Sequence, residues 1–283
     1  MAISGKRRSG SAGTSASENS PFRLYLFRSH GAADRLNFTA VMKIHTLLAL
    51  VLAPAFALAQ PVAEAPSKST APAERFKEDW WKKRWESKLE ATKAAKDTEL
   101  VFLGDSITQG WEGGGKKTWE EHFAKYKPLN LGFSGDRTEH LLWRLKTDEA
   151  NLKELKPKVA VILIGTNNTG HEQRPAADTA AGIKAVLDEL HTLWPNTKLL
   201  VLSVFPRGEN ADDKLRKLND EINVLVGKFA DNKTIYVQDI SSSFVAADGT
   251  LPKEIMPDKL HLSGKGYELW AQAIEPKLKE LGL

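Results

Sequence analysis

The stretch Lys158-Val-Ala-Val-Ile-Leu-Ile164, which continues as Gly165-Thr-Asn-Asn168, indicates the fold more clearly than any other part of the sequence. A strand with apolar side chains on both faces is typical of the centre of a parallel sheet, because helices cover both faces of such a sheet. Glycine and polar residues begin where this strand ends, and α/β proteins bind ligands beyond the carboxyl ends of their strands. The stretch therefore predicts a central parallel strand with a candidate site at its end.

Segments on both sides of this strand alternate between strand and helix patterns. Short apolar runs predict strands over residues 100–103, 129–131, 158–164, 198–204 and 234–237, and helical periodicity predicts helices over 138–147, 176–193, 213–229 and 263–280. Alternation of this kind predicts an α/β fold, in which helices cover both faces of a parallel sheet. No internal repeat is visible, so residues 99–283 are interpreted as one domain.

Residues 42–59 have the pattern of a secretory signal peptide. Met42-Lys43 begins a short basic region, an apolar run over 47–58 follows, and Ala57-Leu58-Ala59 provides small residues for cleavage. The run is shorter than the ~20 apolar residues that span a bilayer, and a buried core helix is the less favoured alternative. We therefore expect export to the periplasm or the exterior, cleavage near Ala59, and no membrane span in the mature protein. Residues 1–41 are interpreted as an extension upstream of the true start, because they show no sustained periodicity.

Two further segments precede the predicted domain. Residues 60–73 are rich in Pro, Ala and Ser and predict a flexible tether. Residues 74–98 predict an amphipathic helix, and its large apolar side chains recur at helical spacing: Phe76, Trp80, Trp81, Trp85 and Leu89. Packing of this stripe against the domain or a partner subunit is favoured over a sugar-binding platform, because amphipathic stripes are usually buried.

The composition is that of a soluble globular protein, with 41% apolar and 27% charged residues. The formal net charge of +4 originates in residues 1–59, which hold seven basic and two acidic side chains, so that residues 60–283 have a net charge of −1. We therefore expect no nucleic-acid partner. The chain has no cysteine, which excludes disulfides, a thiolate nucleophile and cysteine zinc sites. The histidines lack metal-ligand spacing, and we expect neither a metal nor a cofactor.

One glycine-rich segment is close to a phosphate-binding loop: Gly110-Trp-Glu-Gly-Gly-Gly115-Lys116-Lys117. Such a loop needs Ser or Thr at the position of Lys117 to hold magnesium, so an NTPase is not favoured. We interpret the segment as a flexible loop beside the candidate site. The pattern G-x-S-x-G is absent, so the nucleophile elbow of the α/β-hydrolases is not predicted either.

Residues suited to acyl transfer follow the predicted strands or precede the last helix: Ser106, Gly135, Asn167, Asp258 and His261. A serine hydroxyl is a weak nucleophile and needs a base, which His261 can provide. Asp258 lies three residues before His261, a spacing that lets one turn bring its carboxylate to the other imidazole nitrogen. The oxyanion of a tetrahedral intermediate needs donors. The backbone N–H groups of Ser106 and Gly135 and the side-chain amide of Asn167 can provide three.

Four ordered blocks, Gly104-Asp105-Ser106, Gly135, Gly165-Thr166-Asn167 and Asp258-x-x-His261, resemble those of the SGNH, or GDSL-type, hydrolases. Residues 130–136, 142–145, 156–158, 165–168, 206–209 and 260–262 further resemble the catalytic subunits of the intracellular platelet-activating-factor acetylhydrolases. The resemblance covers residues 100–283 and implies a three-layer α/β/α flavodoxin-like fold with a five-stranded parallel sheet in the order 2-1-3-4-5. It also implies metal-free ester hydrolysis. The implied catalytic residues are Ser106, Asp258 and His261, and the implied oxyanion hole is Ser106, Gly135 and Asn167.

These observations predict a secreted serine esterase that removes short acyl groups, chiefly acetyl, through an acyl-enzyme intermediate. The resembling subunits are intracellular whereas this chain carries an export pattern, so O-acetyl groups on carbohydrate are the preferred substrate, with other small esters beside them. A phospholipid like platelet-activating factor is the alternative substrate, and a non-catalytic carbohydrate-binding protein is the alternative class. We expect Asp105, Asp136 and Trp111 to bind substrate, and the resemblance implies a homodimer.

Overall fold

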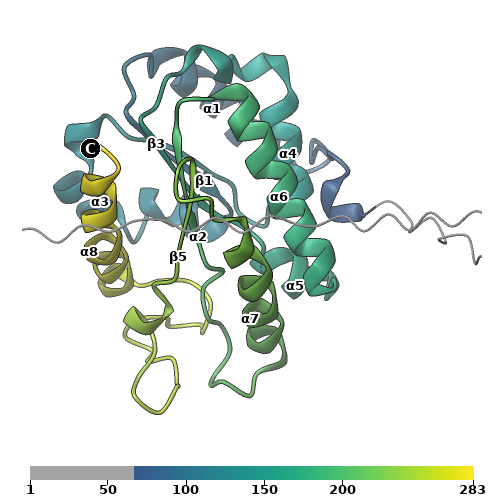
Figure 1. The fold of residues 1–283 in the computed structure, drawn as a ribbon, viewed down its shortest axis with the longest axis vertical. Coiled ribbons are helices and arrows are strands. Elements are labelled where there is room, and N and C mark those ends of the chain that lie inside the picture. The colour runs from purple at the N-terminus through teal and green to yellow at the C-terminus, as the bar shows by residue number, and fades with distance from the viewer. Residues whose placement is uncertain (1–66) are drawn as a thin grey trace, which may run out of the picture. The chain divides into compact units, whose positions relative to one another are not determined.

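The computed structural model describes residues 67–283. The segments expected to be an upstream extension (1–41), a signal peptide (42–59) and the start of a tether (60–66) lie outside the described residues. A five-stranded parallel sheet lies at the centre of the described part (Figure 1). Its strands are β1 (Leu100–Gly104), β2 (Leu129–Gly132), β3 (Val159–Leu163), β4 (Lys198–Leu202) and β5 (Ile235–Gln238), in the order β2-β1-β3-β4-β5. The α/β class and the strand order 2-1-3-4-5 are thus confirmed.

The helices that surround the sheet are α1 (Asp79–Ala94), α2 (Ser106–Gln109), α3 (Lys116–His122), α4 (Thr138–Lys146), α5 (Thr166–Glu172), α6 (Ala176–Leu193), α7 (Lys214–Val226) and α8 (Gly264–Glu280). Helix α6 has the bounds that its periodicity predicts. Helices α2, α3 and α5 were not expected, because each is too short to show a periodic apolar pattern. Within residues 67–283, no helix combines the length and apolarity needed to cross a membrane.

Alternate residues along each strand face opposite helical layers. Val101 and Leu103 of β1 pack in one apolar cluster with residues of α1, α4, α6 and α7, whereas Leu100 and Phe102 pack in another with residues of α2 and α8. Figure 1 shows α6 and α7 on one side of the sheet and α3 and α8 on the other. The three-layer arrangement explains why β1 and β3 are apolar throughout, since both of their faces are buried.

The register of the central strands brings their ends to one edge of the sheet. Gly104, the last residue of β1, pairs with Gly132 of β2 and with Leu163 of β3. Because the strands are parallel, the chain leaves all three at the same edge, and the loops that follow lie beside one another. Gly104 is needed for this packing, since a Cβ atom there would lie 2.2 Å from the carbonyl oxygen of Leu163.

The segment 67–73 is not the flexible tether that its composition predicts. It contains the 3-10 turn η1 (Lys68–Thr70), and the side chain of Ser69 is fully buried. The Ser69 hydroxyl donates a hydrogen bond to Asp178 and accepts one from Arg174, and the Ser69 carbonyl accepts one from Thr138 (3.0 Å). Composition indicates flexibility only where no partners exist, and here buried polar partners hold the segment against the domain.

The tryptophan stripe packs against the domain, as its spacing predicts, on a helix that begins at Asp79 rather than at residue 74. Trp81 and Trp85 are 0% and 4% exposed and contact Phe133, the residue that follows β2. Trp80 is the exception, because 42% of its surface is exposed. One tryptophan of the stripe is therefore not part of the core.

Residues 110–117, expected to be a flexible loop, instead form the 3-10 turn η2 (Gly110–Glu112) and the start of α3. Gly115 is buried, and a Cβ atom there would lie 2.6 Å from Trp111 and 2.8 Å from Tyr267. Glycine here allows two aromatic rings to pack closely. The expectation that Trp111 binds substrate is also wrong, because its side chain is 1% exposed and lies among other aromatic rings.

Candidate active site

Ser106, His261 and Asp258 meet at the carboxyl edge of the sheet, although 155 positions separate the serine from the histidine. Ser106 begins α2 directly after β1, and the other two residues lie in the loop before α8. The Oγ atom of Ser106 lies 2.9 Å from Nε2 of His261, and Nδ1 of His261 lies 2.7 Å from Oδ2 of Asp258. Because an ionised carboxylate can only accept, Nδ1 carries the proton and Nε2 can accept the serine proton.

A left-handed turn holds Asp258 against His261. Lys259 has a φ of 61°, and its backbone N–H and carbonyl bond to Met256 (3.0 Å) and Gly208 (2.9 Å). Oδ1 of Asp258 accepts the backbone N–H of His261 (2.7 Å) while Oδ2 faces the ring. Partial burial raises the pKa of Asp258, but hydrogen bonds from the side chain and backbone of His261 outweigh burial and lower the pKa overall. The carboxylate therefore stays ionised and can stabilise an imidazolium.

The three predicted oxyanion donors lie in the segments that follow β1, β2 and β3. Gly135 has a φ of +71°, a conformation that favours glycine. Among residues 67–283, neither the backbone N–H of Ser106 nor that of Gly135 has a hydrogen-bond acceptor. Nδ2 of Asn167 donates one proton to the carbonyl oxygen of Asp136 (2.9 Å), and its second proton has no acceptor in the described chain. The predicted donors are thus available to an oxyanion.

The carboxylate of Asp136 anchors the loop after β2 and does not face substrate. It is fully buried. Its Oδ1 atom accepts hydrogen bonds from Arg75 (2.9 Å) and from the indole of Trp81 (2.8 Å), and Oδ2 accepts one from Arg144 (3.0 Å). Arg75 also donates to the carbonyl of Ser134 (2.8 Å). The expected substrate-binding role of Asp136 is therefore wrong, because three interior donors enclose the carboxylate.

The three residues that hold Asp136 are not among those predicted from the sequence. Arg75 and Trp81 lie in the N-terminal segment, far from Asp136 in sequence, so no local pattern links them to it. The position of Arg144 could have indicated a buried ion pair, since Arg144 is a cation between the buried residues Leu142 and Leu145 of a helix. It is 2% exposed, and a buried arginine requires a carboxylate partner.

Asp105 does not bind substrate either, because its side chain is 1% exposed. It caps α2, and its Oδ1 atom accepts the backbone N–H of Ile107 (3.0 Å). Its Oδ2 atom is buried and has no hydrogen-bond partner within residues 67–283. Burial raises the pKa of Asp105 to about 7, against the opposing effect of the Ile107 N–H.

We expect the free energy of unfolding of Asp105→Asn to depend less on pH than that of wild type. The folded protein keeps the Asp105 proton up to about pH 7, whereas the unfolded chain releases it near its usual pKa of 3.8, so folding stability falls as the pH rises between these values. The free energy of unfolding of the variant, minus that of wild type, should be about 2 kcal/mol larger at pH 8 than at pH 5 when both are measured by urea unfolding. Asp97→Asn, at a side chain that is 80% exposed, is the control. An equal difference in the free energy of unfolding between variant and wild type at both pH values would contradict a raised pKa for Asp105.

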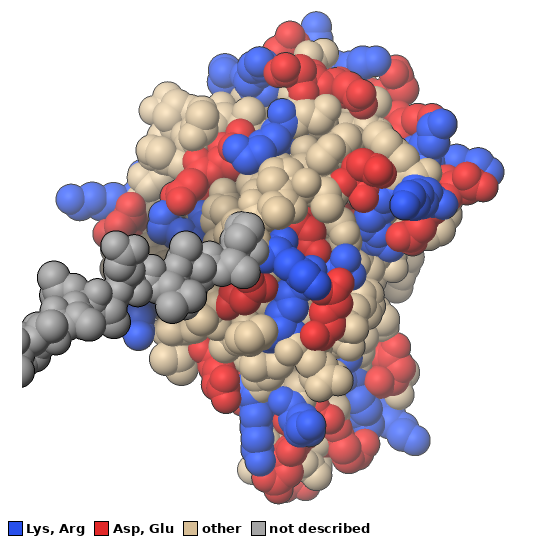
Figure 2. Space-filling view, turned by 90° about the vertical axis from the view of Figure 1, so that its right-hand side faces the viewer, with Lys and Arg blue, Asp and Glu red and all other residues tan. Residues whose placement is uncertain are grey.

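On the face of the molecule shown in Figure 2, basic and acidic side chains are interspersed and form no single-signed patch. Within the part of the chain that the structure describes, no group of three histidine, aspartate or glutamate side chains is placed to hold a metal ion. The polar groups at the carboxyl edge are thus a hydroxyl, an imidazole, a carboxylate and amide donors, which together suit acyl transfer.

The fold and the site together define a class of protein. The serine of a Gly-Asp-Ser block follows the first strand of a parallel sheet in the order 2-1-3-4-5, and it contacts a histidine that precedes the last helix. This combination defines the GDSL-type acylhydrolases. The sequence profile of the GDSL-like lipase/acylhydrolase family matches residues 102–269. The chain belongs to this family.

Known proteins that are similar to this chain are named as acetylhydrolases, lipases and esterases. The platelet-activating factor acetylhydrolase IB subunit alpha1 of Homo sapiens is 36% identical over 202 residues, which are 70% of this chain and 84% of that protein. A GDSL-like lipase from Bacteroides thetaiotaomicron has a TM-score of 0.57 at 20% identity, covering 70% of this chain and 97% of its own. A carbohydrate acetylesterase from Sinorhizobium meliloti has a TM-score of 0.52 at 18% identity, covering 65% and 99%. At these identities the two structures support the fold.

Proposed function

We propose that this protein is a serine esterase that removes acetyl groups from carbohydrate, with Ser106, His261 and Asp258 as its catalytic residues. The observation that carries the proposal is the 2.9 Å contact between Oγ of Ser106 and Nε2 of His261, whose other nitrogen faces a carboxylate. Side chains so placed can pass a proton from the hydroxyl to the imidazole as the oxygen attacks. A binding protein has no need of this arrangement, so the non-catalytic alternative is disfavoured.

The proposed reaction proceeds in two halves. Ser106 Oγ attacks the ester carbonyl carbon while its proton passes to His261 Nε2, and the N–H groups of Ser106, Gly135 and Asn167 stabilise the oxyanion. The intermediate collapses when the imidazolium protonates the alcohol oxygen, which leaves as the free alcohol. Water then attacks the acyl-serine, His261 takes its proton and returns it to Oγ, and the carboxylic acid departs.

Two acetylated substrate classes compete, and the export pattern of the sequence supports carbohydrate. The relative from Homo sapiens is named for a phospholipid, platelet-activating factor, whereas a structural neighbour is named for carbohydrate. The export pattern of residues 42–59 supports the second class, because acetylated polysaccharides are extracellular. The test is acetate release from acetylated xylan, pectin and glucomannan beside acetylated lipids, with p-nitrophenyl acetate as the general esterase substrate. Release from the lipids alone would replace carbohydrate by phospholipid.

We also propose that the protein is exported, on the evidence of its sequence alone. The basic start at Met42, the apolar run and the small residues before Gln60 support cleavage near Ala59. N-terminal sequencing of the protein collected outside the cytoplasm should find a first residue near Gln60. A mature chain that still contains residues 22–38 would contradict both the cleavage site and the proposed start at Met42.

A further inference from the structure

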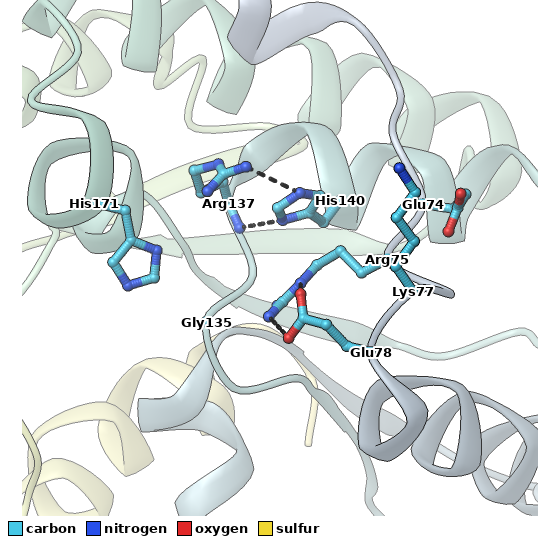
Figure 3. Close-up of a pocket in the computed structure, with 8 residues that line it drawn as sticks. All are labelled: Glu74, Arg75, Lys77, Glu78, Gly135, Arg137, His140 and His171. Carbon is cyan, nitrogen blue, oxygen red and sulfur yellow. Dashed lines mark hydrogen bonds and ion pairs between the residues drawn. The ribbon is translucent and has the colours of Figure 1, made fainter.

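A cavity of about 410 Å³ adjoins the proposed oxyanion hole, and Gly135 forms part of its wall (Figure 3). Its other described lining residues are Glu74, Arg75, Lys77, Glu78, Arg137, His140 and His171. Figure 3 shows His171 on one side, the Arg75–Glu78 pair on the other, and the loop at Gly135 between them. The volume lies within the range of small-molecule sites, about 300–1,000 Å³. An ester whose carbonyl oxygen reaches the Gly135 N–H can therefore extend into this cavity.

Helix α5 links the far wall of the cavity to the same oxyanion hole. It carries Asn167 near its start and His171 one turn later. Residues four apart on a helix lie on the same face, so His171 is the next side chain along that face after the proposed amide donor. Two segments that build the oxyanion hole thus also build this cavity, and it is placed to hold part of the substrate.

The lining suits a polyhydroxylated group better than a lipid chain or an anion. None of the described lining side chains is a purely apolar one, which disfavours an acyl chain. The two arginines are already paired. Arg75 meets both oxygens of Glu78 (2.8 and 2.7 Å), and Arg137 meets Glu139 (2.6 Å). Lys77 is a third lining cation, but the carboxylates of Glu74 and Glu78 lie in the same lining, so little net positive charge is available for a phosphate. Paired guanidinium and carboxylate groups offer donors and acceptors side by side, as sugar hydroxyls require.

His171 adds an uncharged group of the same kind. Burial, together with the positive charges of Arg137, Arg75 and Arg207, lowers its pKa below the usual histidine value. A neutral imidazole both donates and accepts a hydrogen bond, which again matches a hydroxyl.

Trp80 does not line the cavity itself but contacts two residues that do, Glu78 and Arg75. Its indole N–H donates to Glu78 (3.1 Å), and the guanidinium of Arg75 lies 5.2 Å from the ring centre. It is 42% exposed, whereas Trp81 beside it is fully buried. The negative face of an exposed aromatic ring attracts the polarised C–H groups of a sugar.

We propose that this cavity is the subsite for the sugar of an acetylated carbohydrate, with Trp80 as the stacking surface and with His171 and the Arg75–Glu78 pair as hydrogen-bond partners of its hydroxyls. The proposal rests on the proposed esterase function and assigns the part of the substrate that leaves as the alcohol.

The test compares Trp80→Ala and His171→Ala with wild type on acetylated xylo-oligosaccharides and on p-nitrophenyl acetate, which lacks a sugar. The ratio of kcat/KM for the oligosaccharide to kcat/KM for p-nitrophenyl acetate should fall about tenfold in each variant, mainly through a higher KM, because uniform binding is lost. The matched controls are Val224→Ala, at the other large apolar side chain exposed in the described chain, and His191→Ala on α6. Both should keep the wild-type ratio.

Four results would overturn the subsite. An unchanged ratio would remove Trp80 and His171 from substrate binding, and so would an equal loss on both substrates, which indicates a structural role. A selective loss on an acetylated phospholipid would assign the cavity to a lipid head group. Wild type that cleaves p-nitrophenyl acetate but no acetylated carbohydrate would reject the subsite and leave the esterase intact. Wild type that cleaves nothing would reject the esterase itself.

Discussion

Ser106→Ala should lower turnover of p-nitrophenyl acetate by at least about 10³-fold while the protein remains folded. The variant lacks the oxygen that lies 2.9 Å from His261 Nε2, so no acyl-enzyme can form, and only oxyanion stabilisation and binding remain. Ser106 is partly exposed, and its replacement should change the free energy of unfolding by less than about 0.5 kcal/mol. The measurements are initial rates with active-site burst kinetics and a urea unfolding curve for each protein.

The matched control is Ser242→Ala, at an exposed serine of the 3-10 turn Ser241–Ser243, which should retain wild-type turnover. A second arm combines Ser106→Ala with His261→Ala. When two groups act as one unit, removing both lowers turnover little more than removing either one. The double variant should therefore be about as slow as either single variant. Equal rates for wild type and Ser106→Ala would reject the proposed mechanism, and multiplied losses in the double variant would reject joint action.

Asp136→Ala should lower the free energy of unfolding by about 3–5 kcal/mol, because it leaves buried positive charge without a partner. Arg144 is 2% exposed, and Asp136 is its carboxylate partner at 3.0 Å. Arg75 keeps Glu78 and the carbonyl of Ser134 but loses the carboxylate of Asp136. The measurement is urea unfolding at neutral pH, read from the midpoint with the slope checked for change.

Glu112→Ala is the control, because Glu112 also has two cationic partners, Arg84 (2.9 Å) and Lys88 (2.6 Å), but is 40% exposed. Exposed pairs contribute about 1 kcal/mol or less. If Asp136→Ala does not fold, Asp136→Asn keeps the shape and one acceptor oxygen and allows a kinetic reading. That variant should lower kcat more than it raises KM, since the loop carries a proposed oxyanion donor. A loss of stability no larger than that of Glu112→Ala would show that the buried carboxylate is not an anchor.

The N-terminal segment supplies residues both to the anchor of Asp136 and to the proposed sugar subsite. Arg75, Trp80 and Trp81 all lie before residue 102, where the match to the family profile begins. Arg75 and Trp81 hold Asp136, and Trp80 contacts Glu78, which lines the cavity together with Gly135. Residues outside the matched segment therefore complete the loop that carries one oxyanion donor. Removal of this segment is expected to affect both folding and catalysis.

The sequence was sufficient to predict the sheet and the residues that meet at its edge. Strands buried on both faces are apolar along their whole length, so β3 and β4 are visible as unbroken runs. The polar residues that follow such runs are conspicuous because little else in the core is polar. Helix α6, with its long apolar stripe, has the predicted bounds of Ala176–Leu193. Short helices such as α5 (Thr166–Glu172) could not be predicted, because seven residues hold too few periodic positions.

The direction in which side chains point at the strand ends could not be predicted from the sequence. Asp105 and Asp136 both lie beside site residues, which made them reasonable substrate ligands, yet both point into the protein. Whether such a carboxylate faces solvent or the core depends on which distant donors the fold supplies. For Asp136 the nearest donors are Arg75 and Trp81, more than fifty positions away in sequence.

The fold class and the five residues proposed to act in acyl transfer can be predicted from local patterns, because burial and backbone chemistry leave such patterns in the sequence. The tertiary structure is needed to see that Ser106 and His261 are in contact, that the carboxylates of Asp105 and Asp136 are interior, and that Trp80 alone of its stripe is exposed. Hydrogen bonds and burial at these positions depend on groups from several elements at once. Their partners are set by how the parallel strands bring distant loops to one edge.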